Sequence, residues 1–463
     1  MDARMLRVAG DAIVDGTGER VHLRGVGLGG WMTMENFITG YPGTESQMRR
    51  ALRRTLGDDA YEAFLDRFWQ TFFDAADADH LAALGVTCVR VPFSYHHLED
   101  DLAPFELKES GFARLDRVVR LLADRGIRTI LDLHAAPGYQ NQHWHSDNPT
   151  HRAMFWTHRH FQDRVVHLWE ALADRYRDDP WVAGYNLLNE PADATGEVVG
   201  PFYARLERAV RAVDPHHVLF LDGNTYATDF RPFDGLTLEN VVWAAHDYAL
   251  PGIASPSAYP GTTRGEHHDR DVVEATFLRR TEHMRRGGTP VWVGEFGPVY
   301  TGDAERDAGC DRLLRDQLEI YAEHDAGWSL WTYKDIGLQG VVHVRPDAPY
   351  LTTIAPALEK KRRLGTDSWG GRDTHVRDVL DPVEALLARE FPDFDPYPWG
   401  TRQWVHLLVR NILLAEPLVD DYARCFAGLD AEAVRALADD FRLDRCVVRE
   451  PLTTTLRTAL STP

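Results

Sequence analysis

The chain has 463 residues, 44% of them hydrophobic and 26% charged, which is the composition of a globular protein. Its length exceeds what one ordinary core organises, so we expect one large domain with an accessory segment. A formal net charge of −20 argues against a nucleic-acid partner, because such partners require a basic face. An uncharged polyol such as a sugar is compatible with that charge.

The start of the chain shows no export signal. Met1–Met5 leads directly into polar sequence, without a basic segment followed by an apolar one. No stretch reaches the length of a membrane span, so we expect no membrane partner and a cytoplasmic location. A Cys425–Cys446 bridge is open on sequence grounds, but thiols of a chain without export signals usually stay reduced.

Short β-branched segments alternate with amphipathic helical patterns from the first strand onward. One such helix has a single apolar stripe and is followed by Gly126, a residue type typical of helix ends. Repeated strand–helix alternation predicts an α/β protein with a (β/α)8 TIM barrel. The predicted strands are Val21–Gly27, Val86–Val91, Ile127–Leu133, Val182–Leu188, Val218–Leu221, Asn240–Ala245, Pro290–Gly294 and Gly327–Trp331.

Two segments depart from this alternation. Met32–Asp74 follows the first strand as a β1–α1 insertion, which we expect over the C-terminal mouth of the barrel. After Lys360 the alternation stops, and we predict a catalytic barrel over residues 1–360 and a mostly helical C-terminal extension over residues 361–463. The extension is expected to pack on the barrel or to mediate a homodimer. Its predicted helices are Thr401–Ala415, Pro417–Ala427 and Asp430–Phe441, the last with Asp430 as N-cap.

Two glutamates follow predicted strands on opposite sides of the barrel, where such folds gather their functional groups. Glu190 ends strand four and Glu295 ends strand seven, so the two carboxyls can face each other across the mouth. Retaining glycoside hydrolysis needs two carboxyls about 5–5.5 Å apart. Glu295 must be ionised to attack, which Arg90 would favour. Glu190 must hold a proton, which the charge of Glu295 would promote.

Further polar and aromatic residues lie at matching strand ends and could orient the sugar and the two carboxyls. Asn189 is suited to a hydrogen bond with the sugar 2-hydroxyl, and Trp331 offers a flat apolar face to a pyranose ring. The other residues expected to orient hydroxyls and carboxyls are His134, His246 and Tyr248.

Leu188-Asn189-Glu190-Pro191 and Gly294-Glu295-Phe296-Gly297 resemble the acid/base and nucleophile motifs of glycoside hydrolase family 5, and the likeness spans roughly residues 20 to 335. The resemblance implies that Glu190 is the acid/base and Glu295 the nucleophile. It also implies site positions for Arg90, His134, Asn189, His246, Tyr248 and Trp331.

The N-terminal half is similar to the exo-β-1,3-glucanase branch of that family, in Arg24–Trp31, Glu35–Thr39 and Asp132–Asn141. The similarity implies exo action, with Glu35 against the terminal sugar in a dead-end pocket. The chain departs from that branch at His143-Trp144-His145 and at Thr332–Asp335, which leaves the aglycone open.

Several of these residues also have a simpler structural interpretation. Asn-Glu-Pro could simply end a strand, Trp331 could be a core residue and Glu35 a solvated acid. His143, His145 and His151 fit no standard zinc spacing and are expected on a rim or surface, so no metal and no cofactor is expected.

The leading functional hypothesis is an exo-acting retaining β-glycosidase for a β-glucoside or a small β-glucan oligosaccharide. An endo-β-glucanase or mannanase with an open cleft is the alternative among enzymes. A carbohydrate-binding pseudoenzyme is the alternative from another class.

Overall fold

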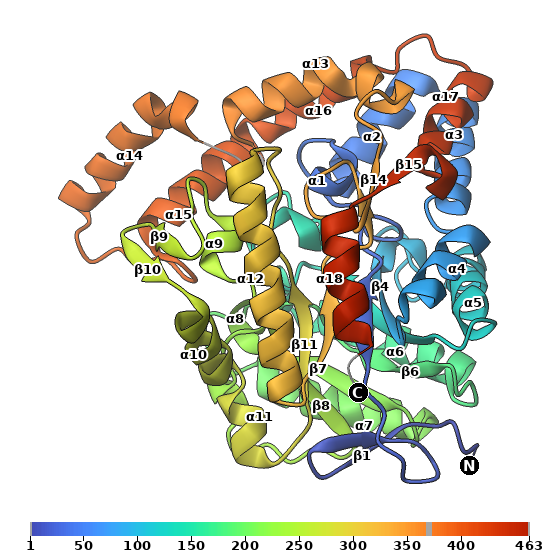
Figure 1. Ribbon diagram of the computed structural model, residues 1–463. Helices are drawn as coiled ribbons and strands as arrows, with labels where there is room; N and C mark the ends of the chain where they lie inside the picture. Colours follow the sequence, from blue (N-terminus) through green and yellow to red (C-terminus); the bar gives the residue numbers. More distant parts are fainter. Residues whose placement is uncertain (1, 367–372, 462–463) are drawn as a thin grey trace.

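The computed structural model describes residues 2–366 and 373–461, and a closed parallel barrel forms its centre (Figure 1). Neighbouring strands follow the order β11-β12-β3-β4-β5-β6-β7-β8, and β11 also pairs with β8, which closes the ring. The predicted (β/α)8 barrel is therefore confirmed. Its strands are β3 (Arg24–Gly27), β4 (Cys88–Ser94), β5 (Arg128–Ala135), β6 (Val182–Asn186), β7 (Val218–Asp222), β8 (Val241–His246), β11 (Val291–Phe296) and β12 (Gly327–Leu330).

Amphipathic helices surround the barrel because each must bury one apolar stripe against the strands. In α5 the predicted stripe from Phe112 to Leu122 is buried. After β7 the described chain has only the short α8 (Asn224–Ala227) and a turn at Arg231–Phe233 where a full helix would stand. The longer helices are α4 (Ala75–Leu84), α5 (Glu109–Ala123), α6 (Arg159–Tyr176), α7 (Val199–Val213), α10 (Arg270–Arg280), α11 (Glu282–Gly287) and α12 (Ala304–Glu323).

Residues that point into the barrel change from apolar to charged along several strands. In β5, for example, Ile130 belongs to an apolar cluster at one end, whereas Asp132 and His134 follow at alternate positions toward the other. The same apolar cluster contains Leu6 and Ile13 from the N-terminal hairpin of β1 (Arg7–Ala9) and β2 (Ala12–Val14). The hairpin thus closes the apolar end, and the charged end becomes the mouth.

Strands β4 and β5 extend beyond their predicted ends, to Ser94 and Ala135. Strand β4 is longer than predicted because it also pairs with a segment outside the barrel. The Ser94 N–H donates to the carbonyl of Met32 over 2.8 Å, so the first residues of the insertion prolong the ladder. The insertion then forms α1 (Asn36–Thr39), α2 (Glu45–Leu56) and α3 (Asp58–Thr71), with Thr44 and Gln47 in a capping box at the start of α2.

The C-terminal extension packs on the barrel and on the insertion, with α16 against α2 and α17 against α3 (Figure 1). Asp430 caps α17 as predicted, accepting from the backbone of Glu432 and Ala433. The elements of this part are α13 (Pro349–Leu364), α14 (Arg377–Glu390), α15 (Gly400–His406), a π-helical continuation (Leu407–Leu413), α16 (Ala415–Arg424), α17 (Ala431–Ala438), β15 (Cys446–Val448) and α18 (Glu450–Leu460).

The last helix occupies the place of the barrel's eighth helix. In a (β/α)8 barrel that helix lies between the seventh and the first, and α18 packs against both α12 and α4 (Figure 1). Strand β15 joins β13 (Lys334–Asp335) and β14 (Val342–Val344) in a small sheet beside it. The extension therefore completes the ring of helices around the barrel. The predicted division of the chain at residue 360 stays a prediction.

Two other sequence expectations concern cysteines and membranes. Cys88 is fully buried in the barrel interior, as expected for a small core residue. Cys425 and Cys446 are both free, so the bridge left open by the sequence is not formed. Within the described ranges, we find no helix with the length and apolarity that crossing a membrane requires.

Candidate active site

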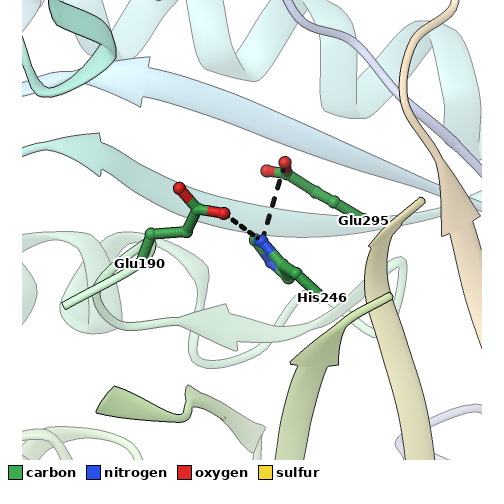
Figure 2. A group of neighbouring side chains, drawn as sticks. All are labelled: Glu190, His246 and Glu295. Atoms are coloured by element: carbon green, nitrogen blue, oxygen red, sulfur yellow. Dashed lines mark hydrogen bonds and ion pairs between the residues drawn. The ribbon is translucent and has the colours of Figure 1, made fainter. Parts of the chain in front are cut away.

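The two glutamates meet at the mouth of the barrel, as the strand positions predicted (Figure 2). One carboxylate oxygen of Glu190, one of Glu295 and one ring nitrogen of His246 all lie within 4.8 Å of one another. His246 Nδ1 lies 2.7 Å from Glu190 Oε1 and 3.6 Å from Glu295 Oε2. All three side chains are buried, so their charges interact in a poorly solvated environment.

Glu295 is held by two donors. Arg90 Nη1 donates to Oε1 over 2.6 Å, and the Tyr248 hydroxyl donates to Oε2 over 2.9 Å. Arg90 is fully buried, and its other donors reach the Oδ1 atoms of Asn186 and Asn189 over 2.8 and 2.7 Å. Burial lowers the pKa of Arg90, but the charges of Asp132 and Glu295 outweigh it, so the guanidinium remains charged. A fixed cation therefore lies directly against the Glu295 carboxylate.

Glu190 adopts a backbone conformation that few non-glycine residues adopt. Its φ is 46°, in the left-handed region, and such strain persists only where neighbours hold it. The Glu190 N–H donates to Asp222 Oδ2 over 2.9 Å, and Asn141 Nδ2 donates to the Glu190 carbonyl over 3.1 Å. These two contacts fix the peptide so that the Glu190 side chain points toward Glu295.

The pKa of Glu190 is shifted in the direction opposite to the sequence expectation. Burial raises the pKa of Glu190, but hydrogen bonds with His145 and His246 outweigh burial and hold that pKa well below its usual range. Burial lowers the pKa of His246, whereas Glu295, Asp222 and Glu190 raise it, and the result is a raised pKa. The two groups therefore titrate as one coupled pair across their 2.7 Å contact.

Glu35, His134 and Trp331 form a second group beside the carboxylates. His134 Nδ1 lies 2.8 Å from Asp132 Oδ2, and its Nε2 lies 3.0 Å from Glu35 Oε1. Burial lowers the pKa of His134, but Asp132 and Glu35 outweigh it and raise the pKa to about 10. The His134 ring stacks on Trp331 with centroids 5.3 Å apart and planes at 4°. The insertion thus delivers Glu35 into the site.

Two glycines explain how Trp331 lies across the end of β3. A Cβ at Gly27 would come within 2.7 Å of Trp331 Cε3, and one at Gly29 within 2.6 Å of Cζ2. Any larger residue at either position would displace the indole. The glycine-rich Arg24–Trp31 segment therefore makes room for an aromatic ring.

The structure brings every predicted site residue into one cluster. Three residues of this cluster were not predicted as site residues. Asp222 ends β7 and lies 3.3 Å from His246 Nε2, and its position directly after a predicted strand was a usable signal. Asn186 is the last residue of β6 and contacts Arg90. His145 Nε2 lies 3.1 Å from Glu190 Oε2, although the sequence predicted only a rim or surface position for it. A loop residue has no periodicity from which such a contact could be found.

Glu190, His246 and Glu295 are also the one group in the described residues whose spacing suits a metal ion. Each member already has a protein partner, and Arg90 places a positive charge against Glu295. A cation would have to displace those contacts, so the geometry suits a carboxylate pair better than a metal centre.

The comparisons with known proteins agree with this geometry. Residues 58–337 match the family described as Cellulase (glycosyl hydrolase family 5). A protein named Beta-xylosidase from Phanerodontia chrysosporium is 46% identical over 462 residues, covering 96% of each chain. A probable glucan 1,3-beta-glucosidase A from Neosartorya fischeri is 27% identical over 358 residues, covering 69% of this chain and 84% of the relative. The chain therefore belongs to glycosyl hydrolase family 5 and is a glycoside hydrolase.

Solved structures support the fold. One described as a glycoside hydrolase aligns with a TM-score of 0.53 at 22% identity, covering 68% of this chain and 90% of its own. An endogalactoceramidase aligns with a TM-score of 0.52 at 23% identity, covering 72% and 75%. The resemblance to family 5 predicted from the sequence is confirmed, as is the likeness to its 1,3-β-glucosidases.

Proposed function

We propose that the protein is an exo-acting retaining β-glycosidase that releases one sugar from a β-glucoside or a small β-glucan oligosaccharide. The observation that carries the proposal is the pair of carboxylates within 4.8 Å, one bound by Arg90 and the other paired with His246. So close an approach of one oxygen from each carboxylate favours retention, because inversion needs about 6.5–9.5 Å between the carboxyls to admit a water molecule.

In the first step, Glu295 attacks the anomeric carbon while the glycosidic bond breaks. Glu190 takes up the proton that it shares with His246 Nδ1 across their 2.7 Å contact and passes it to the leaving oxygen. Glu295 loses its negative charge as the ester forms, and His246 becomes neutral as its proton leaves. Removing one negative and one positive charge together avoids an uncompensated charge in a buried site.

In the second step, water attacks the anomeric carbon of the ester. Glu190 accepts the water proton, and His246 shares that proton again over the same contact. The ester bond to Glu295 breaks, and its carboxylate returns to Arg90 and Tyr248. The pair thereby regains the single proton with which the cycle began.

Exo action is supported by the way the insertion is braced on one side of the mouth. Phe37 of α1 packs edge-on against Trp144 at 5.8 Å, and the Ser46 N–H donates to Asp147 Oδ1 over 2.9 Å. These contacts tie the insertion to the loop after β5. A wall there would remove subsites beyond the first sugar and leave the site open to a chain end.

A β-xyloside is the second candidate substrate, favoured by the 46% identical relative named Beta-xylosidase. The direct test is hydrolysis of p-nitrophenyl β-glucoside and β-xyloside, together with cello- and laminari-oligosaccharides, with analysis of the released sugars. Monosaccharide as the sole early product supports exo action. Internal cleavage of oligosaccharides would favour the endo-glucanase or mannanase alternative, and no turnover of any glycoside would favour a pseudoenzyme.

Homodimer formation through the extension stays a prediction. It is supported by one face of α14 on which Val379, Val383 and Leu386 are exposed. Light scattering of the purified protein tests it: a monomer mass at micromolar concentration would contradict the prediction.

A further inference from the structure

We propose that the C-terminal extension builds the aglycone-binding wall of the active site, with Trp399 as its platform. This inference rests on the proposed glycosidase function and adds a part of the chain that lies beyond the barrel strands. It assigns to this wall a ring-shaped leaving group, either a second sugar or an aryl group.

The extension reaches the barrel mouth at residues 397–399. The Tyr397 hydroxyl lies 2.9 Å from Thr225 Oγ1, in the segment directly after β7. The Trp399 ring lies 4.5 Å from the ring of Tyr226 and 5.0 Å from that of His143, measured between centroids. Three segments far apart in sequence therefore bring their rings together at this point.

The group lies on the Glu190 side of the catalytic pair. His145 contacts Glu190 Oε2 at 3.1 Å, and its ring is 5.5 Å from His143 and 6.1 Å from Tyr226. Because the acid/base protonates the leaving oxygen, the aglycone must pass on its side of the scissile bond. The rings from His145 to Trp399 thus follow the path that a leaving group takes.

The side chain of Trp399 is more exposed to solvent than that of its neighbour Tyr226. Tyr226 is buried, but Trp399 is 44% exposed, so much of its indole surface remains accessible. A tryptophan that serves only packing would be expected to bury most of its large apolar surface. An accessible indole connected to Glu190 through the rings of His143 and His145 is suited to stack on a sugar or aryl ring.

The backbone that presents Tyr226 is strained. Thr225, Tyr226 and Ala227 have φ values of 53°, 60° and 57°, all left-handed, a conformation that costs free energy for each residue with a Cβ. The Tyr226 hydroxyl donates to Gln142 Oε1 over 3.0 Å and accepts from the Gln142 N–H, which secures the ring. Strain held in this way at a site rim indicates that the position of the ring matters.

The test compares two substrates that carry the glycone preferred by the wild type. In the β-glycosyl fluoride the leaving group occupies no aglycone site, whereas the β-linked disaccharide needs one. Trp399→Ala is expected to lower kcat/KM for the disaccharide roughly tenfold, mainly through KM, and to leave the fluoride unaffected. Trp399→Phe should restore part of the loss. Phe391→Ala is the matched control, since Phe391 is an exposed ring of the same extension.

Equal effects of Trp399→Ala on both substrates, or none on the disaccharide, would overturn the aglycone wall while leaving the glycosidase function intact. A wild-type protein that acts on neither substrate would overturn the proposed function itself, and this inference with it.

Discussion

His246 Nδ1 lies 2.7 Å from Glu190 Oε1, and neighbouring carboxylates raise the pKa of His246, whereas hydrogen bonds with His145 and His246 lower the pKa of Glu190. In the proposed mechanism, the acid is therefore a pair of residues and not an isolated protonated carboxyl. Because the two groups interact strongly, a pH profile reports values that belong to the pair.

Replacing Glu190 allows its proposed roles as acid and as base to be tested separately. Glu190→Ala should lower kcat on glycosides with poor leaving groups about 10²–10⁴-fold, because their oxygen must be protonated as it leaves. Activated aryl glycosides should form the ester readily, and azide should restore turnover by replacing water. Steady-state rates over a series of leaving groups, with and without azide, measure this. An equal loss on all leaving groups without azide rescue would contradict the assignment.

His145 should tune the acidity of the pair. Its contact with Glu190 Oε2 lowers the pKa of Glu190, so its removal should raise that pKa. A charge-assisted hydrogen bond contributes about 1.5–3 kcal/mol, which corresponds to a shift of about one to two pH units. In His145→Ala the alkaline limb of the kcat/KM profile should therefore move to higher pH.

The matched control for His145 is His151→Ala. His151 belongs to the same loop, and its Nδ1 contacts the carbonyl of Gln142 rather than a carboxylate. Its profile should match that of the wild type. An unshifted alkaline limb in His145→Ala, or equal shifts in both variants, would show that the contact with Glu190 does not set the acidity.

Strand ends could be predicted from the sequence, whereas loop contacts could not. Glu190, Glu295 and His246 lie at ends of segments whose β-branched pattern marks them as strands, and closure of the barrel then brings them together. His145 and Trp399 belong to segments without periodicity, and their positions depend on long-range packing. The same holds for α18, whose place in the barrel is decided by contacts with α4 and α12.

Stability should depend on pH through His134. Its folded-state pKa is about 10, above the ordinary value of 6.5, so its charged contacts stabilise the fold fully below pH 6.5. That contribution is lost as pH rises through 10. His134→Gln should therefore unfold more easily at pH 6, by a few kcal/mol at most, and the gap to the wild type should narrow toward pH 10. Urea unfolding at several pH values measures it, and a pH-independent gap would contradict the charged state.

Glu35 should contribute to binding of the terminal sugar. Its carboxylate lies 3.0 Å from His134, within the group that includes Trp331. Loss of a charged partner for a buried hydroxyl costs about 1.5–3 kcal/mol, so Glu35→Ala should lower kcat/KM roughly ten- to hundredfold. Glu62→Ala, at an exposed position of the same insertion, is the control. Unchanged kinetics of Glu35→Ala on the best glycoside would remove Glu35 from the site.

Trapping of the covalent ester tests the central claim most directly. A 2-deoxy-2-fluoro glycoside with a good leaving group should inactivate the enzyme, because fluorine slows both formation and hydrolysis of the ester, whereas the activated leaving group speeds its formation alone. Mass spectrometry of the digested protein should then show one glycosyl adduct, on the peptide that contains Glu295, and none in Glu295→Gln. An adduct on another residue, or turnover with inversion of the anomeric centre, would contradict the two-carboxylate account.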